Sequence, residues 1–208
     1  MTKKWLRERG QEYYYRLAKV KGYRSRAAFK LLQISEKYDL IDEGDTVVDL
    51  GAAPGGWLQA ARTIVGESGF VLGIDLKPIE NLPWSNVVFR VGSIKEFEDL
   101  KIDELLPNGQ ADVVLSDVAP NISGVWEVDH ARQIDLAESS LKIATVILRK
   151  GGNFLVKAFQ GELLEGFVKE VRKFFSVVKI VKPKASRVKS SEVYVLGLKL
   201  LFKLEIKV

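Results

Sequence analysis

The stretch VVDLGAAPGGW at residues 47–57 decides the fold. A short apolar run leads into a turn that contains Gly51, Gly55 and Gly56, and a helical pattern follows at 56–65. Glycine permits backbone conformations and close approaches that a side chain would block, and doubly wound α/β folds use such a strand–turn–helix unit to bind nucleotides. A tight strand–helix connection would use the same glycines, so the function of the turn depends on the residues around it.

The sequence on either side of this turn alternates between strand and helix patterns. Short, β-branched, almost continuously apolar runs are typical of strands buried on both faces, and they occur at 45–50, 69–75, 86–91, 111–117 and 152–159. Helical patterns lie between them at 56–65, 127–149 and 162–174. This alternation predicts an α/β fold with a doubly wound, mostly parallel, Rossmann-like sheet.

The C-terminal part departs from the alternation. Residues 192–203 alternate in polarity and follow the apolar run at 176–181 too closely for a crossover helix. We predict that the two segments form an antiparallel pair at the edge of the sheet, which gives the sheet an antiparallel C-terminal edge strand. The basic loop, residues 183–191, would join them. A third short strand near the C-terminus is the alternative.

Length and composition predict a single domain, 1–208, because the 208 residues contain no linker-like stretch and no repeat. Its Rossmann-like core would span 45–203, preceded by a basic helical extension, 1–38, with helices at 3–20 and 26–38. The chain has no cysteine and one histidine, which excludes a disulfide scaffold and a Cys- or multi-His metal site. No apolar run suits a membrane span or a signal peptide, so we expect a cytoplasmic monomer.

The net charge of +5 is unevenly distributed. Residues 1–30 carry ten basic and two acidic groups, residues 179–208 carry eight and two, and the body between them is acidic. Two basic ends around an acidic body suggest a polyanion-binding face, although a solvated surface would have the same charges. Aromatic residues interleave with the N-terminal cations, as base stacking would require: Trp5, Tyr13, Tyr14, Tyr15 and Tyr23.

Asp75 ends the second predicted strand, twenty residues after Gly55. Doubly wound folds present a carboxylate to a ribose diol at this position. The turn lacks the G-x-G-x-x-G spacing of nicotinamide or flavin dinucleotide sites. Together these residues predict a different adenosine-containing cofactor.

The turn DLGAAPGGW (49–57) resembles the cofactor loop of S-adenosylmethionine-dependent methyltransferases. With its tryptophan it resembles the FtsJ/RrmJ family of RNA ribose 2′-O-methyltransferases, and four further motifs extend the likeness: YRSRAAFKL (23–31), SDVAPNISG (116–124), FLVKAFQG (154–161) and SSEVYVLG (190–197). The resemblance implies S-adenosylmethionine as cofactor, no metal, and RNA as substrate. The lack of an appended domain favours a uridine of large-subunit ribosomal RNA. Methylation of a tRNA anticodon loop, or RNA binding without catalysis, are the alternatives.

The family's Lys-Asp-Lys-Glu tetrad falls on Lys30, Asp117, Lys157 and Glu192. Lys157 interrupts an apolar strand, so a buried ion pair is its structural alternative. The resemblance implies that Lys157 either takes the proton of a ribose 2′-hydroxyl or stabilises the oxyanion as a fixed cation. Asp117 would orient Lys157, and Lys30 and Glu192 would position the ribose.

The resemblance also implies contacts outside the tetrad. Those to the cofactor would come from Gly51, Pro54, Gly55, Gly56, Trp57, Asp75, Ser93, Ile94 and Asp117. The family commonly has an aspartate where this chain has Ser93, and Trp57 is equally suited to packing. We expect RNA contacts from Arg24, Arg26, Asn121, Lys182, Lys184, Arg187 and Tyr194. His130 is expected at the surface or in a helix cap.

Overall fold

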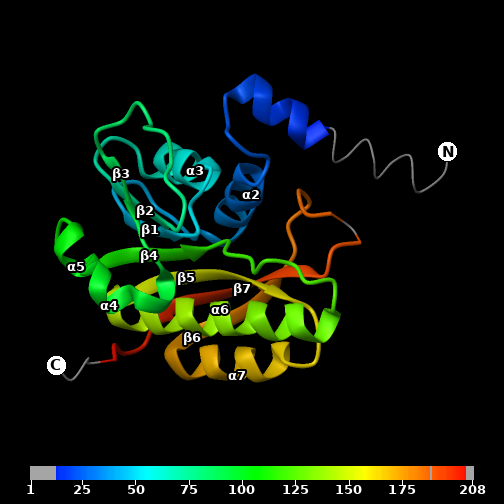
Figure 1. Ribbon diagram of the computed structural model, residues 1–208. Helices are drawn as coiled ribbons and strands as arrows, with labels where there is room; N and C mark the ends of the chain where they lie inside the picture. The colour runs from blue at the N-terminus through cyan, green and yellow to red at the C-terminus, as the bar shows by residue number, and fades with distance from the viewer. Residues whose placement is uncertain (1–12, 188, 205–208) are drawn as a thin grey trace.

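The computed structural model describes residues 13–187 and 189–204, which form a seven-stranded sheet covered by helices on both faces (Figure 1). The strands are β1 (Thr46–Leu50), β2 (Phe70–Asp75), β3 (Val87–Val91), β4 (Ala111–Ser116), β5 (Leu148–Phe159), β6 (Phe175–Val181) and β7 (Glu192–Leu200). The main helices are α2 (Ala28–Tyr38), α3 (Gly56–Val65), α6 (Trp126–Ile147) and α7 (Leu164–Phe174). The predicted doubly wound α/β fold is confirmed.

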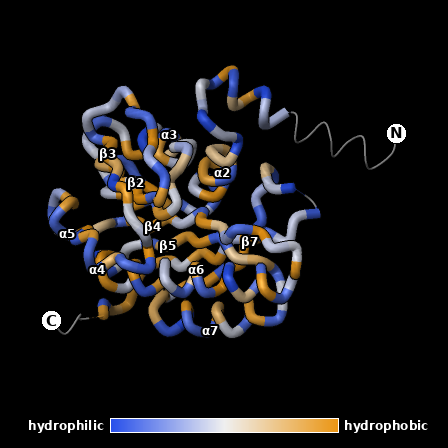
Figure 2. Tube along the Cα trace, viewed as in Figure 1, coloured by the Kyte–Doolittle hydropathy of each residue, from blue (hydrophilic) through white to orange (hydrophobic). Residues whose placement is uncertain are grey.

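The apolar runs become strands because both faces of the sheet are covered. Every residue of β1 is buried, and its neighbours β2 and β4 run parallel to it. Helices α2 and α3 pack on one face and α6 and α7 on the other, with a hydrophobic cluster under each pair (Figure 1). Hydrophobic residues gather along the strands (Figure 2).

The strand order is β3-β2-β1-β4-β5-β7-β6. The winding direction therefore reverses between β1 and β4. Open α/β sheets bind ligands in the crevice outside the carboxyl ends of the strands at such a reversal. The turn after β1 and the loop after β4 are the segments that meet there.

The predicted antiparallel pair is confirmed, with one refinement of its order. Strand β7 is antiparallel to both β5 and β6 and lies between them, so β6 is the outermost strand. This insertion aligns Lys157 of β5 with Tyr194 of β7. The alternative third strand does not occur within the described residues, which end at 204 at this terminus.

Some boundaries differ from those predicted. The helix expected to end near residue 149 ends at Ile147, because Leu148 is buried in the sheet and Arg149 pairs with Asp112 of β4. Three unpredicted single turns, η1 (Ile94–Glu96), α4 (Phe97–Leu100) and α5 (Ile102–Leu105), follow β3.

The N-terminal helix, predicted at 3–20, is present at 13–21. Its first part and Trp5 lie outside the described residues. No helix in the described part of the chain is long and apolar enough to cross a membrane.

Candidate active site

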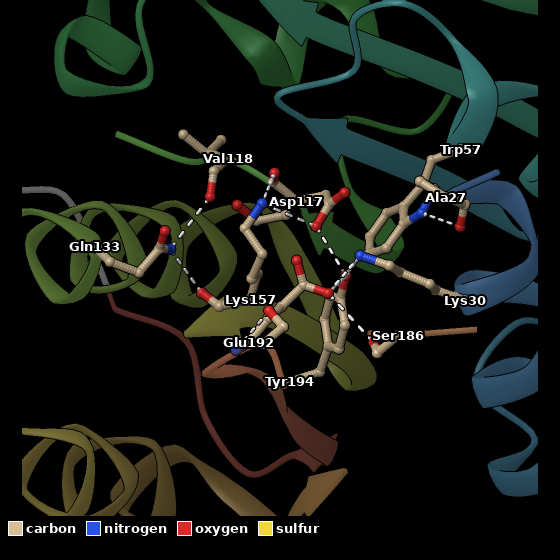
Figure 3. A network of polar contacts seen from close by, with 12 residues as sticks. Ala27, Lys30, Trp57, Asp117, Val118, Gln133, Lys157, Ser186, Glu192 and Tyr194 are labelled. Atoms are coloured by element: carbon tan, nitrogen blue, oxygen red, sulfur yellow. Dashed lines mark hydrogen bonds and ion pairs between the residues drawn. The ribbon is translucent and has the colours of Figure 1, made fainter. Parts of the chain in front are cut away.

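Four charged side chains from separate segments of the chain meet at the carboxyl ends of β4 and β5 (Figure 3). Lys157 Nζ lies 3.1 Å from Asp117 Oδ1 and donates to the Asp117 carbonyl oxygen at 2.6 Å. Lys30 Nζ, from α2, pairs with Glu192 Oε1 at the start of β7. Both lysines are buried. The structure therefore brings the four predicted tetrad residues together as two ion pairs.

The hydroxyl of Tyr194 joins the two pairs. It donates to Asp117 Oδ1 at 2.9 Å and accepts from Lys30 Nζ at 3.2 Å (Figure 3). Burial first, and then the charges of Asp117 and Glu192, raise the pKa of Tyr194 well above its usual value, so the hydroxyl keeps its proton at neutral pH.

The predicted role of Tyr194 in stacking on RNA is therefore wrong. The side chain is fully buried, and its ring lies 5.8 Å from the Trp57 ring. Alternation along a strand could have indicated this, because residues 192 and 194 point to the same face of the sheet. Tyr194 instead fixes the two ion pairs of the tetrad relative to each other through its hydroxyl.

Trp57 fixes the helix that carries Lys30. Its Nε1 donates to the Ala27 carbonyl oxygen at 2.8 Å, which attaches the start of α2 to the start of α3. Because the side chain is buried in this contact, it has a packing role. The contact of Trp57 with the cofactor stays a prediction.

The turn after β1 is held by hydrogen bonds from its backbone. Asp75 Oδ2 accepts from Ala53 N and Oδ1 accepts from Lys77 N, both at 2.9 Å. Each carboxylate oxygen has a second lone pair, so Asp75 can still accept from ribose hydroxyls. Gly51 has φ +80°, and a Cβ there would lie 2.6 Å from Val118 Cγ2. Glycine at 51 thus lets the loop after β4 approach the turn.

The other two glycines of the turn make room for the segment before α2. A Cβ on Gly55 would lie 3.2 Å from Arg24 Nη1, and one on Gly56 would overlap Ser25 Oγ. The Arg24 guanidinium donates to the carbonyl oxygens of Pro54 (3.3 Å), Glu80 (2.6 Å) and Asn81 (3.0 Å).

The Arg24 guanidinium thus ties the turn to the segment at 80–81. The predicted contact of Arg24 with RNA stays a prediction. Ser93 accepts from Lys95 N at 3.2 Å as the cap of η1, and Ile94 is buried. The contacts of Pro54, Ser93 and Ile94 with a cofactor stay predictions.

Sequence reasoning missed Asp49, which is the only acid in β1. It is fully buried, and neither carboxylate oxygen has a hydrogen-bond partner among the described residues. Burial first, and then the charges of Asp117 and Asp75, raise the pKa of Asp49 well above its usual value. The carboxylates of Asp75 and Asp117, at the carboxyl ends of β2 and β4, suit a cofactor with positive charge. The sulfonium and ammonium of S-adenosylmethionine fit this requirement, and a dinucleotide pyrophosphate does not.

The comparison with family models agrees with this site. Residues 23–200 match the model described as FtsJ-like methyltransferase, a span that includes all four tetrad residues. The chain belongs to the FtsJ-like methyltransferase family. It is therefore a methyltransferase that uses S-adenosylmethionine, as the five motifs predicted.

Relatives with curated names are similar over most of this FtsJ-like methyltransferase. "Ribosomal RNA large subunit methyltransferase E" of Methanococcus maripaludis is 53% identical over 94% of this chain and 76% of its own length. The protein of the same name from Methanocaldococcus jannaschii is 51% identical over 94% of this chain and 81% of its own.

Solved structures give the same fold. A putative ribosomal RNA methyltransferase from Plasmodium falciparum has a TM-score of 0.77 at 28% identity and covers 87% of this chain and 100% of that one. Fibrillarin from Aeropyrum pernix, in complex with S-adenosylmethionine, has a TM-score of 0.54 at 19% identity and covers 85% of this chain and 75% of that one. The fibrillarin likeness concerns the fold alone.

In this methyltransferase the basic loop, residues 183–191, lies against the tetrad. Ser186 Oγ donates to Glu192 Oε1 at 3.2 Å, and Ala185 N donates to Gln33 Oε1 of α2 at 3.0 Å. Burial first, and then the nearby charge of Arg187, lower the pKa of the half-buried Arg26. The charge of Glu192 opposes this shift, so Arg26 interacts electrostatically with both the basic loop and the tetrad.

The remaining predicted RNA residues are on the surface. Lys182, Lys184, Arg187 and Asn121 are exposed, although Lys182 Nζ also donates to the Ser190 carbonyl oxygen at 2.6 Å. Lys182 and Lys184 line a cavity of about 680 Å³ between the N-terminal helix, α2 and the end of β6, together with Tyr14 and Tyr38. Their contacts with RNA stay predictions.

The free energy of unfolding of the wild type should fall as pH rises because of Asp49, and the Asp49→Asn variant should not show this fall. The folded state holds the Asp49 proton more tightly than the unfolded state, whose aspartate pKa is about 3.9. Between that pH and the pKa of Asp49 in the folded state, the unfolded state binds fewer protons than the folded state does. The wild type then loses up to about 1.4 kcal/mol of unfolding free energy per pH unit.

Urea unfolding of both proteins between pH 4 and 8, without cofactor, measures this effect. The stability of the variant relative to the wild type should increase with pH. A difference that is constant across this range would contradict the assignment of Asp49 as a buried, unpaired carboxyl.

Proposed function

We propose that this methyltransferase transfers a methyl group to a ribose 2′-hydroxyl of large-subunit ribosomal RNA, and that the acceptor is a uridine. One observation carries the proposal: two lysine–carboxylate pairs lie side by side at the carboxyl ends of the strands, next to the turn assigned to the cofactor. The names of the relatives at 51–53% identity support ribosomal RNA as the substrate. The uridine rests on the family resemblance.

The cofactor, when bound, supplies a methyl group that is already strongly electrophilic. Gly51, Asp75 and Asp117 would hold it at the ends of β1, β2 and β4. The chain must then align the acceptor oxygen with the methyl group and manage one proton, and positioning accounts for much of such an acceleration.

In this proposal Lys157 acts on the acceptor oxygen. An ammonium has three N–H donors, and Lys157 uses two of them on Asp117. The third remains for the 2′-oxygen of the substrate, where a fixed cation stabilises developing negative charge. The two Asp117 atoms that Lys157 contacts, the carbonyl oxygen and Oδ1, are both hydrogen-bond acceptors and favour the ammonium form. We therefore assign Lys157 as a cation that stabilises the oxyanion. Proton abstraction by Lys157 itself is the alternative.

Lys30 and Glu192 position the ribose in this proposal. Lys30 donates to Glu192 and Tyr194, which leaves one N–H for a ribose oxygen. Glu192 is held in turn by Ser186 of the basic loop. RNA that binds the basic loop would therefore affect the position of the Glu192 carboxylate through this hydrogen bond.

The basic loop should provide part of the RNA affinity. We expect the double variant Lys184→Gln/Arg187→Gln to bind RNA more weakly and to lower the slope of log affinity against log salt, by about 0.7–0.9 for each phosphate that is no longer neutralised. Affinity for S-adenosylmethionine should not change, since neither side chain lies at the cofactor turn. Filter binding over a range of salt concentrations measures the RNA affinity and its slope.

The matched control is Lys169→Gln/Lys173→Gln on α7, which removes two exposed lysines of the helix on the other face of the sheet. This control should retain the wild-type slope. An equal reduction of the slope in both double variants would mean that the RNA has no preferred path over the basic loop.

The proposed substrate is tested with radiolabelled S-adenosylmethionine and three separate pools: large ribosomal subunits, deproteinised ribosomal RNA, and tRNA. We expect label in large-subunit RNA, either as the subunit or as free RNA. Label confined to tRNA would replace the proposed target with a tRNA. No label in any pool would favour a protein that binds RNA without catalysis.

A further inference from the structure

An aromatic stack lies beside the tetrad, at the first residue of α6. The Trp126 ring is 5.5 Å from the His130 ring at an interplanar angle of 9°, and 6.1 Å from the Phe159 ring at 22°. His130 is buried, and its Nε2 accepts from Leu163 N at 3.1 Å, so the expected surface position of His130 is wrong. A Cβ on Gly161 would lie 2.7 Å from the same nitrogen. Trp126 therefore rests on a rigid base.

The stack is the centre of an exposed apolar patch, which we call the Trp126 patch. It consists of Trp126 (44% exposed), Ile122 (66%), Val125 (53%) and Leu163 (47%). Ile122 and Val125 lie shortly before α6, and Leu163 is the N-cap residue of α7 beside His130. Exposed apolar residues grouped in this way mark a site of interaction more often than an isolated apolar residue does. The proposed chemistry does not use it.

The position of the patch relates it to the reacting group. Phe159 follows Lys157 by two residues along β5, a rise of about 7 Å, and is aligned with Glu192 of β7. Gln133 lies two helical turns after Trp126, on the same face of α6. Its Nε2 donates to the carbonyl oxygens of Lys157 at 3.0 Å and Val118 at 3.2 Å (Figure 3). The helix that carries Trp126 is thus fixed to the strand that carries Lys157.

We propose that Trp126 is a stacking platform for a base of the substrate RNA, either that of the methylated nucleotide or that of its neighbour in the strand. The proposal rests on the proposed RNA substrate. Its ligand is a planar, uncharged nucleobase, and no role in phosphate binding is assigned to the patch.

Charge and size favour a base over other occupants. The patch residues are uncharged, and their neighbours in sequence include Glu127 and Glu162, which would repel phosphates. The exposed cations expected to bind RNA lie on the basic loop before β7, whereas the Trp126 patch lies on α6 and the loops beside it. Backbone and base would therefore be held on separate surfaces. A protein partner usually covers about 800 Å² on each side, far more than four side chains present.

The test uses two probes of equal charge, in the presence of S-adenosylhomocysteine: a fluorescein-labelled twelve-residue oligouridine and an abasic ribose-phosphate strand of the same length. Stacking of one base contributes about 1–3 kcal/mol. We expect the wild type to bind oligouridine about tenfold or more tightly than the abasic strand. Trp126→Ala should lose most of that preference, and Trp126→Phe should retain part of it. The salt dependence should stay the same in every variant.

Phe202→Ala is the matched control, because Phe202 is another half-exposed aromatic residue that contacts a phenylalanine, Phe174, and it belongs to the C-terminal segment. It should keep the wild-type preference. A Trp126→Ala protein with undiminished preference would overturn the proposal, as would a wild type that binds both strands equally. A patch that serves a protein partner would give the first of these results.

This binding assay does not depend on methyl transfer. If the proposed enzymatic function fails, large-subunit RNA accepts no label, yet the comparison of oligouridine with the abasic strand still tests the stacking proposal. If only the stacking proposal fails, methyl transfer proceeds and Trp126→Ala retains the wild-type kcat/KM on the RNA that accepts label.

Discussion

The Lys157→Ala variant should lose about 10²- to 10⁴-fold in the rate of methyl transfer, the range expected when a charged group at the reacting oxygen is removed. Its affinity for S-adenosylmethionine should remain close to that of the wild type. The reason is geometric, because Lys157 reaches Asp117 from β5 and leaves the turn after β1 and its Asp75 contacts untouched. Single-turnover rates and calorimetric titration of the cofactor measure the two effects separately.

Two further variants make this result specific. Lys150→Ala removes an exposed lysine from the same strand and should have wild-type activity. Lys157→Arg keeps a positive charge but cannot accept a proton at neutral pH. If Lys157 acts as a fixed cation, the arginine variant should be more active than the alanine variant. Equal inactivity of both would favour Lys157 as the base, and activity of Lys157→Ala within a few-fold of wild type would remove it from the mechanism.

Gly51→Ala should destabilise the protein and weaken cofactor binding together. A residue other than glycine at φ +80° costs about 1–2 kcal/mol. The added Cβ would also lie 2.6 Å from Val118 Cγ2 and 3.0 Å from Val118 N, so the loop after β4 must shift. That shift would move Asp117 away from Lys157 and open the turn. Thermal unfolding and cofactor titration measure the effects.

Gly151→Ala is the matched control, because Gly151 has φ +83° and its added Cβ would meet only the end of the Arg149 side chain, at 3.4 Å. The two variants share the backbone cost and differ in the collision with Val118. Overpacking adds about 1–3 kcal/mol, so Gly51→Ala should unfold at least about 2 °C below Gly151→Ala. Equal unfolding temperatures and unchanged cofactor affinity would show that the approach of Val118 to the turn is not needed.

The sheet could be predicted from the sequence because its signals are local. Continuous β-branched runs such as 45–50 and 111–117 are buried on both faces wherever they pair, and the glycines after the first run end a strand and begin a helix. The order of β6 and β7 could not be read in this way. Either strand of an antiparallel pair can lie outermost, and the choice depends on which one fits against β5.

The tetrad was found through its motifs, while the roles of its neighbours depended on tertiary contacts. Arg24 looks like a free cation in the sequence, but in the fold it faces three carbonyl oxygens. Tyr194 and Trp57 carry aromatic rings that suit stacking on a ligand, and in the fold both are buried in packing. Asp49 was missed because an acid at the end of a strand usually reaches solvent, and here it does not.

In the proposed mechanism the two lysine–carboxylate pairs direct a methyl group to a ribose 2′-oxygen. The most direct test is alkaline hydrolysis of RNA labelled by the enzyme with radioactive S-adenosylmethionine, because a methylated 2′-oxygen cannot attack the adjacent phosphate. We predict that the label appears in alkali-resistant dinucleotides and that Lys157→Ala gives none. Label released as mononucleotides would place the methyl group on a base and contradict the account.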